Sequence, residues 1–220
     1  MPSLPAGFDP LVPLLGIAGG LWGGAADHIA ARWPAHEDGS VRGVDWRTIV
    51  VVVFAMLALA AVPIRFHDAS QRILFGAFFA ACALLMATDL DQRLMPDVVT
   101  LPLIVLGAVA LAWGGDSLVS RSPAWTAILG AILVPGFLFV LSLPFGADAL
   151  GAADVKFMIS VGLIAGLVRI GIAAFFGAIL GGVVVFALLI TRRVSLQSYV
   201  PFGPFLIIGA VWAILLPASS

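Results

Sequence analysis

Long uncharged apolar segments alternate with short polar ones along the whole chain. A helix rises 1.5 Å per residue, so about 20 apolar residues cross the hydrocarbon core of a bilayer. The expected fold is therefore all-α, a polytopic integral membrane protein with about eight transmembrane helices. We expect 1–220 to form a single membrane-embedded domain. The apolar pattern predicts helices over about 10–26, 46–64, 73–88, 98–115, 124–143, 154–168 and 170–191, and another within 194–220.

Composition agrees with a membrane protein and excludes several other classes. Of the 220 residues, 62% are hydrophobic and 10% are charged, and the mean hydropathy is +1.15. This composition leaves no segment for a sizeable soluble domain. A net charge of -1 argues against a nucleic-acid partner. The single cysteine, Cys82, lies inside an apolar run and cannot form an internal disulfide or a thiolate zinc cluster.

A charged island interrupts the apolar pattern between residues 89 and 97. It reads Asp89-Leu90-Asp91-Gln92-Arg93-Leu94-Met95-Pro96-Asp97 and lies between the uncharged runs 73–88 and 98–115. Because the first run has only 16 residues, we expect Asp89 to lie at the end of its helix, at or slightly inside the membrane boundary. Ionisable side chains at such depth are costly, which makes a functional role the default hypothesis.

A second island runs from Gly146 to Lys156 and contains Asp148 and Asp154. It follows a long uncharged run, and another apolar stretch starts at Val155. Two acids at two helix–loop boundaries suggest one water-activating pair. One carboxylate would act as a base toward water while the other, protonated, polarises a carbonyl group.

These islands resemble the two motifs of the type IV leader peptidase family, the prepilin peptidases, which are GxGD-type membrane aspartic proteases. Asp89, six residues and then Pro96-Asp97 is similar to the first motif. The segment 151–156, Gly-Ala-Ala-Asp-Val-Lys, is similar to the second motif, Gly-x-Gly-Asp followed by Val-Lys. The resemblance implies that Asp89 and Asp154 are catalytic. It implies substrate-binding or motif-supporting roles for Asp91, Pro96, Asp97, Gly151, Ala153 and Lys156.

The resemblance also implies a substrate and a location. Members of the family cut the basic leader from type IV prepilin or pseudopilin precursors, without a cofactor or a catalytic metal. The expected partners are such precursors and membrane lipid. The distribution of lysine and arginine predicts that both islands lie on the cytoplasmic side of the inner membrane. In that orientation the inside loops carry seven of these residues and the outside loops carry four. The inside set is Arg32, Arg42, Arg47, Arg93, Lys156, Arg192 and Arg193, and the outside set is Arg65, Arg72, Arg121 and Arg169.

Two departures from the family pattern affect the expected activity. Ala153 stands where the family has its second glycine. If that position needs a positive φ or close approach of substrate, alanine costs about 1 kcal/mol. The loop 33–45 also lacks the two Cys-x-x-Cys pairs of bifunctional members, and it offers one histidine and a few carboxylates. We therefore expect cleavage without efficient methyl transfer from S-adenosylmethionine.

Other interpretations remain open at this stage. Asp91, Asp97 and Asp148 are interpreted as solvated loop charges, and Lys156 and Arg93 as positive-inside anchors or ligands of lipid head groups. A proton-coupled transporter could use Asp89 and Asp154 as a relay, although the internal repeats frequent in such folds are not visible. Ala153 prompts a third hypothesis, a catalytically impaired relative that serves as an assembly scaffold.

Overall fold

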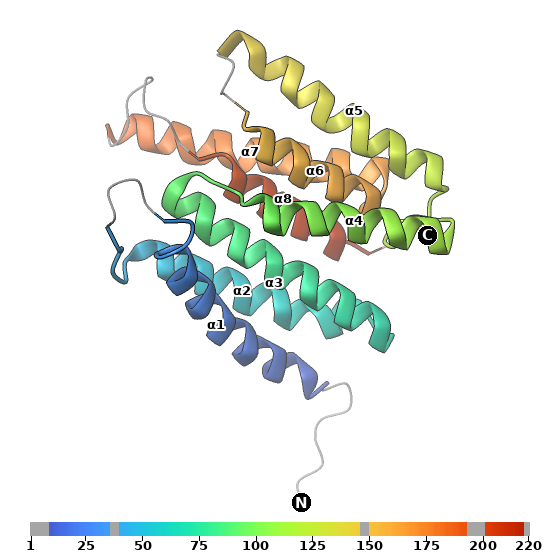
Figure 1. Cartoon of the computed structure of the whole chain (residues 1–220), viewed down its shortest axis with the longest axis horizontal. Coiled ribbons are helices and arrows are strands. Elements are labelled where there is room, and N and C mark those ends of the chain that lie inside the picture. Colours follow the sequence, from blue (N-terminus) through green and yellow to red (C-terminus); the bar gives the residue numbers. More distant parts are fainter. Residues whose placement is uncertain (1–8, 36–39, 146–149, 193–200, 218–220) are drawn as a thin grey trace, which may run out of the picture. The chain divides into compact units, whose positions relative to one another are not determined.

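The computed structural model describes residues 9–35, 40–145, 150–192 and 201–217. In these ranges the chain forms α-helices and one short 3-10 helix, with an isolated bridge between Asp116 and Pro123. The prediction of an all-α fold is therefore confirmed (Figure 1). The helices are α1 (Leu11–Ala30), α2 (Trp46–Arg65), α3 (Ala69–Gln92), α4 (Asp97–Gly114), α5 (Ala124–Ser142), η1 (Leu143–Phe145), α6 (Ala152–Ala165), α7 (Leu167–Ile190) and α8 (Gly203–Leu215).

Several of these helices can cross a bilayer. Four of them, α2, α3, α5 and α7, are long and apolar enough by length and composition. The stretch Asp97–Ala112 of α4 and the whole of α8 are shorter apolar helices. The chain is thus a polytopic membrane protein, as the apolar pattern predicted, and α6 is short at 14 residues.

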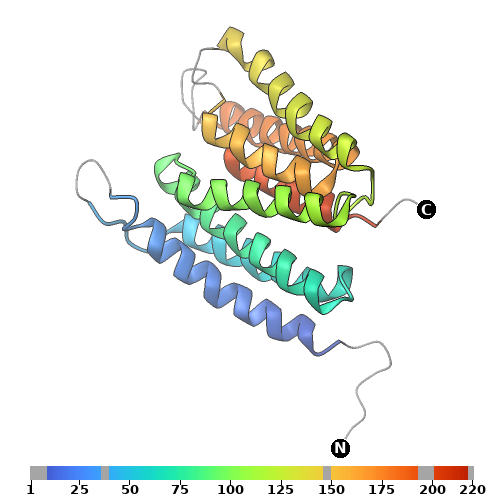
Figure 2. The same cartoon turned by 45° about the vertical axis from the view of Figure 1, so that its right-hand side comes forward.

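The chain divides into two compact units, Met1–Gln92 and Arg93–Ser220. Each unit is described by itself, and the single membrane-embedded domain over 1–220 stays a prediction. In the first unit α1, α2 and α3 run side by side (Figure 2). Close packing of α1 on α2 requires glycine, since a Cβ at Gly19 would lie 2.4 Å from the Ala55 carbonyl oxygen. The Trp22 indole N–H adds a 2.9 Å hydrogen bond to the Ala80 carbonyl of α3.

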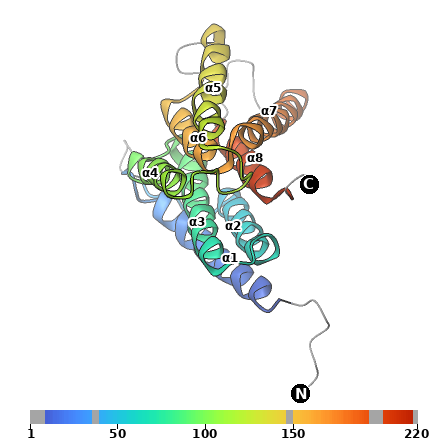
Figure 3. The same ribbon diagram turned by 90° about the vertical axis from the view of Figure 1, so that its right-hand side faces the viewer.

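In the second unit α6 packs against α4 and α5, and α7 packs against α8 (Figure 3). A Cβ at Gly162 of α6 would lie 2.6 Å from Ala131 of α5, and one at Gly209 of α8 would lie 2.2 Å from the Ala173 carbonyl oxygen of α7. These contacts let the backbones approach closely, which is how helices pack in a membrane where no hydrophobic force drives them together.

Two helices continue past the uncharged runs that predict them. Helix α3 extends from the run 73–88 to Gln92, and α1 ends at Ala30 rather than near residue 26. Asp27, Asp91 and Gln92 in these extra turns have partners within the unit, as described below. Because those bonds satisfy the polar groups, charged sequence continues the helix instead of ending it. Asp89 lies in the last turn of α3, so its expected place at the end of its helix is confirmed.

Candidate functional site

Asp89 lies in the last turn of α3 and is buried. Thr88, directly before it, is also buried, and its hydroxyl donates to the carbonyl oxygens of Leu84 and Leu85 one turn earlier. Met86 and Ala87 complete a buried stretch on the same helix. Asp89 is thus a carboxylate carried by a regular helix and largely screened from bulk solvent.

Asp91 is held by two guanidinium groups. One of its carboxylate oxygens, Oδ1, accepts from Arg42 Nε at 2.7 Å and from Arg47 Nη1 at 2.9 Å, and its side chain is only 2% exposed. The interpretation of Asp91 as a solvated loop charge is therefore wrong. Asp91 lies within α3, where ion pairing compensates for the loss of water.

Arg42 connects Asp91 to two further carboxylates. Its Nη1 donates to Asp45 at 2.7 Å, and its Nη2 donates to Asp27 in a very short contact. Burial lowers the pKa of Arg42, but the hydrogen bond and charge of Asp27, with the charges of Asp91 and Asp45, place the pKa above its ordinary value. Arg42 is therefore a permanent positive charge among three acids. We call Arg42 with Asp27, Asp45 and Asp91 the Arg42 cluster.

Neighbouring side chains secure this cluster to the ends of α1 and α2. Asp45 is the N-cap of α2 and accepts the Arg47 amide at 2.8 Å, while its own amide donates to the Thr48 hydroxyl at 3.2 Å. The same hydroxyl donates to Asp27 of α1 at 2.6 Å. The Gln92 side chain donates to carbonyls just at and after the end of α1, Pro34 at 2.7 Å and Ala30 at 3.3 Å.

The Arg42 cluster was not predicted from the sequence. The spacing of Asp45 and Thr48 was the available local signal, since it fits an N-cap and its N3 partner.

Asp154 belongs to the second unit and lies in the first turn of α6. Its Oδ2 accepts the amide of Gly151, the N-cap residue, at 3.3 Å. A carboxylate in the first turn of a helix also interacts favourably with the helix dipole. The half-buried side chain is therefore oriented by the helix start itself. Asp148, the other acid of this island, lies outside the described residues.

Lys156 and Asp97 form an ion pair in the second unit. Lys156 Nζ lies 2.7 Å from one carboxylate oxygen of Asp97 and 2.8 Å from the other. Both side chains are partly exposed, Lys156 at 34% and Asp97 at 55%. Asp97 is the first residue of α4, and Pro96 is its N-cap. The interpretation of Asp97 as a solvated charge holds only in part, because the charge is accessible but paired.

Ala153 adopts ordinary helical backbone as the second residue of α6. Among the described residues other than glycine, positive φ angles occur at Arg93, Arg121 and Arg192, and not at Ala153. The alanine therefore causes no backbone strain at this position. An effect of Ala153 on activity would therefore come from crowding of the substrate by its methyl group and not from a positive φ.

The described residues contain no group of three or more histidine, cysteine, aspartate or glutamate side chains that could hold a metal ion. Three described acids of the islands have partners within their own unit. Asp91 has Arg42 and Arg47, Asp97 has Lys156, and Asp154 has the Gly151 amide. The pairing of Asp89 with Asp154 stays a prediction.

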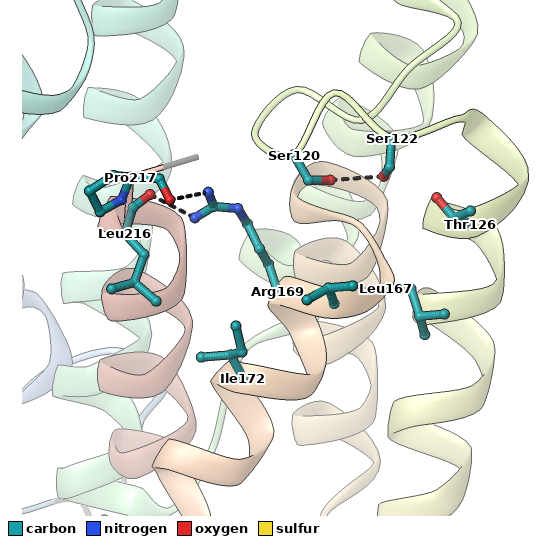
Figure 4. Close-up of a pocket in the computed structure, with 9 residues that line it drawn as sticks. Ser120, Ser122, Thr126, Leu167, Arg169, Ile172, Leu216 and Pro217 are labelled. Atoms are coloured by element: carbon teal, nitrogen blue, oxygen red, sulfur yellow. Dashed lines mark hydrogen bonds between the residues drawn. The ribbon is translucent and has the colours of Figure 1, made fainter. Parts of the chain in front are cut away.

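A pocket of about 510 Å³ lies elsewhere in the second unit. Ser120, Ser122 and Thr126 contribute hydroxyl groups to its wall, and Leu167 and Ile172 contribute apolar side chains (Figure 4). The two serines adjoin Gly166, the C-cap of α6. Because Asp154 lies in the first turn of α6 and this pocket adjoins the other end of that helix, the pocket is separate from the surroundings of Asp154.

Arg169 borders this pocket and is buried. It was predicted as a flanking outside charge ahead of its helix, whereas it lies within α7. Its guanidinium donates to the carbonyl oxygens of Leu216 at 2.8 Å and Pro217 at 3.0 Å (Figure 4). It also donates to the carbonyl oxygen of Ala213 at 2.5 Å. These carbonyls lie at the C-terminal end of α8, where intrahelical donors run out. Arg169 therefore caps a neighbouring helix.

Comparison with known proteins assigns a family to this arrangement of motifs. The model of the type IV leader peptidase family matches residues 76–187, which include both islands. A protein of Stutzerimonas stutzeri is 26% identical over 151 residues, covering 64% of this chain and 52% of the relative. One of Xanthomonas campestris pv. campestris is 34% identical over 150 residues, covering 64% and 49%. One of Burkholderia pseudomallei is 28% identical over 162 residues, covering 72% and 52%.

All three relatives are named prepilin leader peptidase/N-methyltransferase. The chain spans about half the length of these curated relatives. No solved structure matches the chain. Since the family model covers half of the sequence and includes both aspartate motifs, the chain belongs to the type IV leader peptidase family.

Proposed function

We propose that this protein is a membrane-embedded aspartic endopeptidase that removes the basic leader from type IV prepilin or pseudopilin precursors. The observation that carries the proposal is the family match over residues 76–187, which includes both Asp89 and Asp154. In this proposal the two aspartates form the catalytic dyad. The precursor's apolar helix lies in the bilayer, and its leader is cut at the cytoplasmic face.

The chemistry needs two carboxyl groups in different protonation states. The ionised one accepts a proton from water as the water oxygen attacks the scissile carbonyl carbon. The protonated one donates a hydrogen bond to the carbonyl oxygen. The peptide C–N bond then breaks, and the departing amine takes up the proton that the ionised aspartate accepted from water. Neither carboxyl group can perform both roles in one step, so each aspartate is individually necessary.

Local contacts support these roles. The buried last turn of α3 carries Asp89, and the Gly151 amide orients Asp154 at the start of α6. Asp91 and Asp97, expected near the leader's positive charges, already have basic partners in Arg42 and Lys156. A leader lysine or arginine that binds Asp97 therefore exchanges with Lys156, which is the more accessible of these two partners.

Asp89→Asn and Asp154→Asn test the proposal, because each keeps the side-chain shape and removes the ionisable group. The protein is co-expressed with a pilin-like precursor from the same genome, and leader loss is followed on a gel. We expect both variants to abolish cleavage. Asp116→Asn is the matched control, because Asp116 is an exposed acid outside both motifs, and it should cleave like the wild type.

Membrane fractionation checks that every variant inserts. Cleavage that survives either motif substitution removes that residue from the dyad. If the wild type cleaves none of several precursors, the scaffold hypothesis gains support. Proton flux through reconstituted liposomes that depends on Asp89 and Asp154 would instead favour the transporter hypothesis.

A further inference from the structure

Ion pairs and hydrogen bonds hold the last turn of α3 on two sides. On one side Asp91 accepts from Arg42 at 2.7 Å and from Arg47 at 2.9 Å. On another, the Gln92 side chain donates to the carbonyls of Pro34 and Ala30. Terminal helical turns fray easily unless tertiary contacts hold them. These contacts therefore set the position of the turn that also carries Asp89.

Arg42 is the one side chain of the Arg42 cluster that contacts all three acids. It joins Asp27 of α1, Asp45 at the start of α2 and Asp91 of α3. Its side chain is 12% exposed, and those of Asp27 and Asp91 are 7% and 2% exposed. Since these charges are shielded from water, their mutual geometry is stiffer than that of a surface ion pair.

Helix geometry separates this contact from Asp89 itself. Successive residues of a helix are about 100° apart, so Asp89 and Asp91 lie on different faces of α3. Fixing Asp91 and Gln92 in space nevertheless fixes the rotation and height of the whole turn. An error of about 1 Å in the placement of a reacting group can cost about a hundredfold in rate.

We propose that Arg42 is a positioning residue, which acts through Asp91 to hold the last turn of α3 and thereby Asp89. This inference rests on the proposed function of Asp89 and adds a residue outside both motifs to the machinery. Through Arg42, the segment 40–45 connects the C-terminal ends of α1 and α3 with the start of α2.

Arg42→Met and Gln92→Met test the inference from the two sides of the turn. Arg42→Met removes all three ionic contacts, whereas Gln92→Met removes two neutral hydrogen bonds and leaves no buried charge. We expect kcat for leader cleavage to fall at least tenfold in Arg42→Met, with KM changed by less than about threefold. Gln92→Met should lower kcat by a smaller factor. Arg42→Lys keeps the positive charge but lacks the planar guanidinium group with its several donors. Its kcat should therefore lie between those of Arg42→Met and the wild type.

Hydrogen exchange reports on the position of the turn independently of catalysis. In Arg42→Met and Gln92→Met, amides 89–92 should exchange faster, while those in the middle of α3 keep the wild-type rate. Arg32→Met is the matched control, because the described contacts of Arg32 are to His28 within α1. It should change neither kcat nor exchange at 89–92.

Wild-type kcat and wild-type exchange in both test variants would overturn the inference. So would a fall in kcat with unchanged exchange at 89–92, because the residues would then act by another route. If Arg42→Met does not fold, Gln92→Met decides by the same two criteria. If the wild type cleaves no precursor, the proposed function fails, and the exchange rates alone decide whether Arg42 holds this turn.

Discussion

Lys156 of α6 donates to both carboxylate oxygens of Asp97 of α4, at 2.7 and 2.8 Å. The two helices also approach closely further along, since a Cβ at Gly107 would lie 3.0 Å from Leu163. Because Asp97 begins α4 and Lys156 is near the start of α6, the helices run parallel with their N-terminal ends together. Asp154 lies at this same end of the second unit.

We predict opposite effects on leader affinity from neutralising the two partners of this ion pair. Lys156→Met should lower KM for a basic leader, because Asp97 loses its internal cation, and Asp97→Asn should raise KM. Both variants should lose less than about 1 kcal/mol of stability, since the pair is partly exposed. Cleavage kinetics and thermal unfolding in detergent give the two quantities. Equal KM values in the two variants would contradict the exchange of cations at Asp97.

Ala153→Gly should change turnover and stability in opposite directions. Glycine in a helix is less stable than alanine by about 1 kcal/mol, so the melting temperature should fall. Turnover should rise, because glycine gives substrate more room beside Asp154. The two measurements distinguish more space for the substrate from relief of backbone strain, since relief of strain would raise both the turnover and the melting temperature. Unchanged turnover would show that this protein does not need the family's glycine.

Gly209→Ala should destabilise the pairing of α7 and α8. Its Cβ would lie 2.2 Å from the Ala173 carbonyl oxygen, which is backbone and cannot swing away. We expect a loss of about 1–3 kcal/mol, as for other overpacked sites. Gly182→Ala is the control, because a Cβ there meets no atom within 4 Å. It should be neutral or stabilising by up to about 1 kcal/mol. Denaturant unfolding in detergent compares the two, and equal losses would show that the close contact is unimportant.

Leader removal should leave an N-terminus that is largely unmethylated. Relatives of this chain carry N-methyltransferase in their names, whereas its loop 33–45 lacks the paired cysteines of bifunctional members. Mass spectrometry of the processed precursor, with S-adenosylmethionine supplied, measures the methylated fraction. A relative known to methylate the same precursor serves as the positive control. Complete methylation would show that the inference from the loop is wrong.

The apolar pattern predicted the helices because the membrane requires long uncharged runs with internally satisfied backbones. Helices α2, α5 and α7 begin and end within a few residues of their predicted limits. Helices α1 and α3 extend about one turn beyond their uncharged runs, since a pattern that treats charge as a helix boundary ignores ion pairs inside the fold. Asp27 and Asp91 continue their helices because Arg42, distant in sequence from both, binds them.

The motif spacing predicted the candidate site residues, but not their partners. That Asp97 binds Lys156 depends on the packing of α4 on α6, and that packing depends on a glycine 10 residues further along, Gly107. Ala153 was suspected of strain because the family motif has glycine there, whereas the backbone of α6 is regular at this residue. Local dihedral angles of this kind cannot be read from residue types alone.

The capping of α8 by Arg169 has a consequence for the order in which the protein is made. The ribosome adds Arg169 well before its acceptors, the carbonyls of residues 213, 216 and 217, which lie 44 to 48 residues later. Helix α7 therefore emerges ahead of α8, and Arg169 gains these acceptors only when α8 follows it. A precursor truncated before α8 should consequently be a poor product of membrane insertion, and quality-control proteases should remove it faster than the full chain.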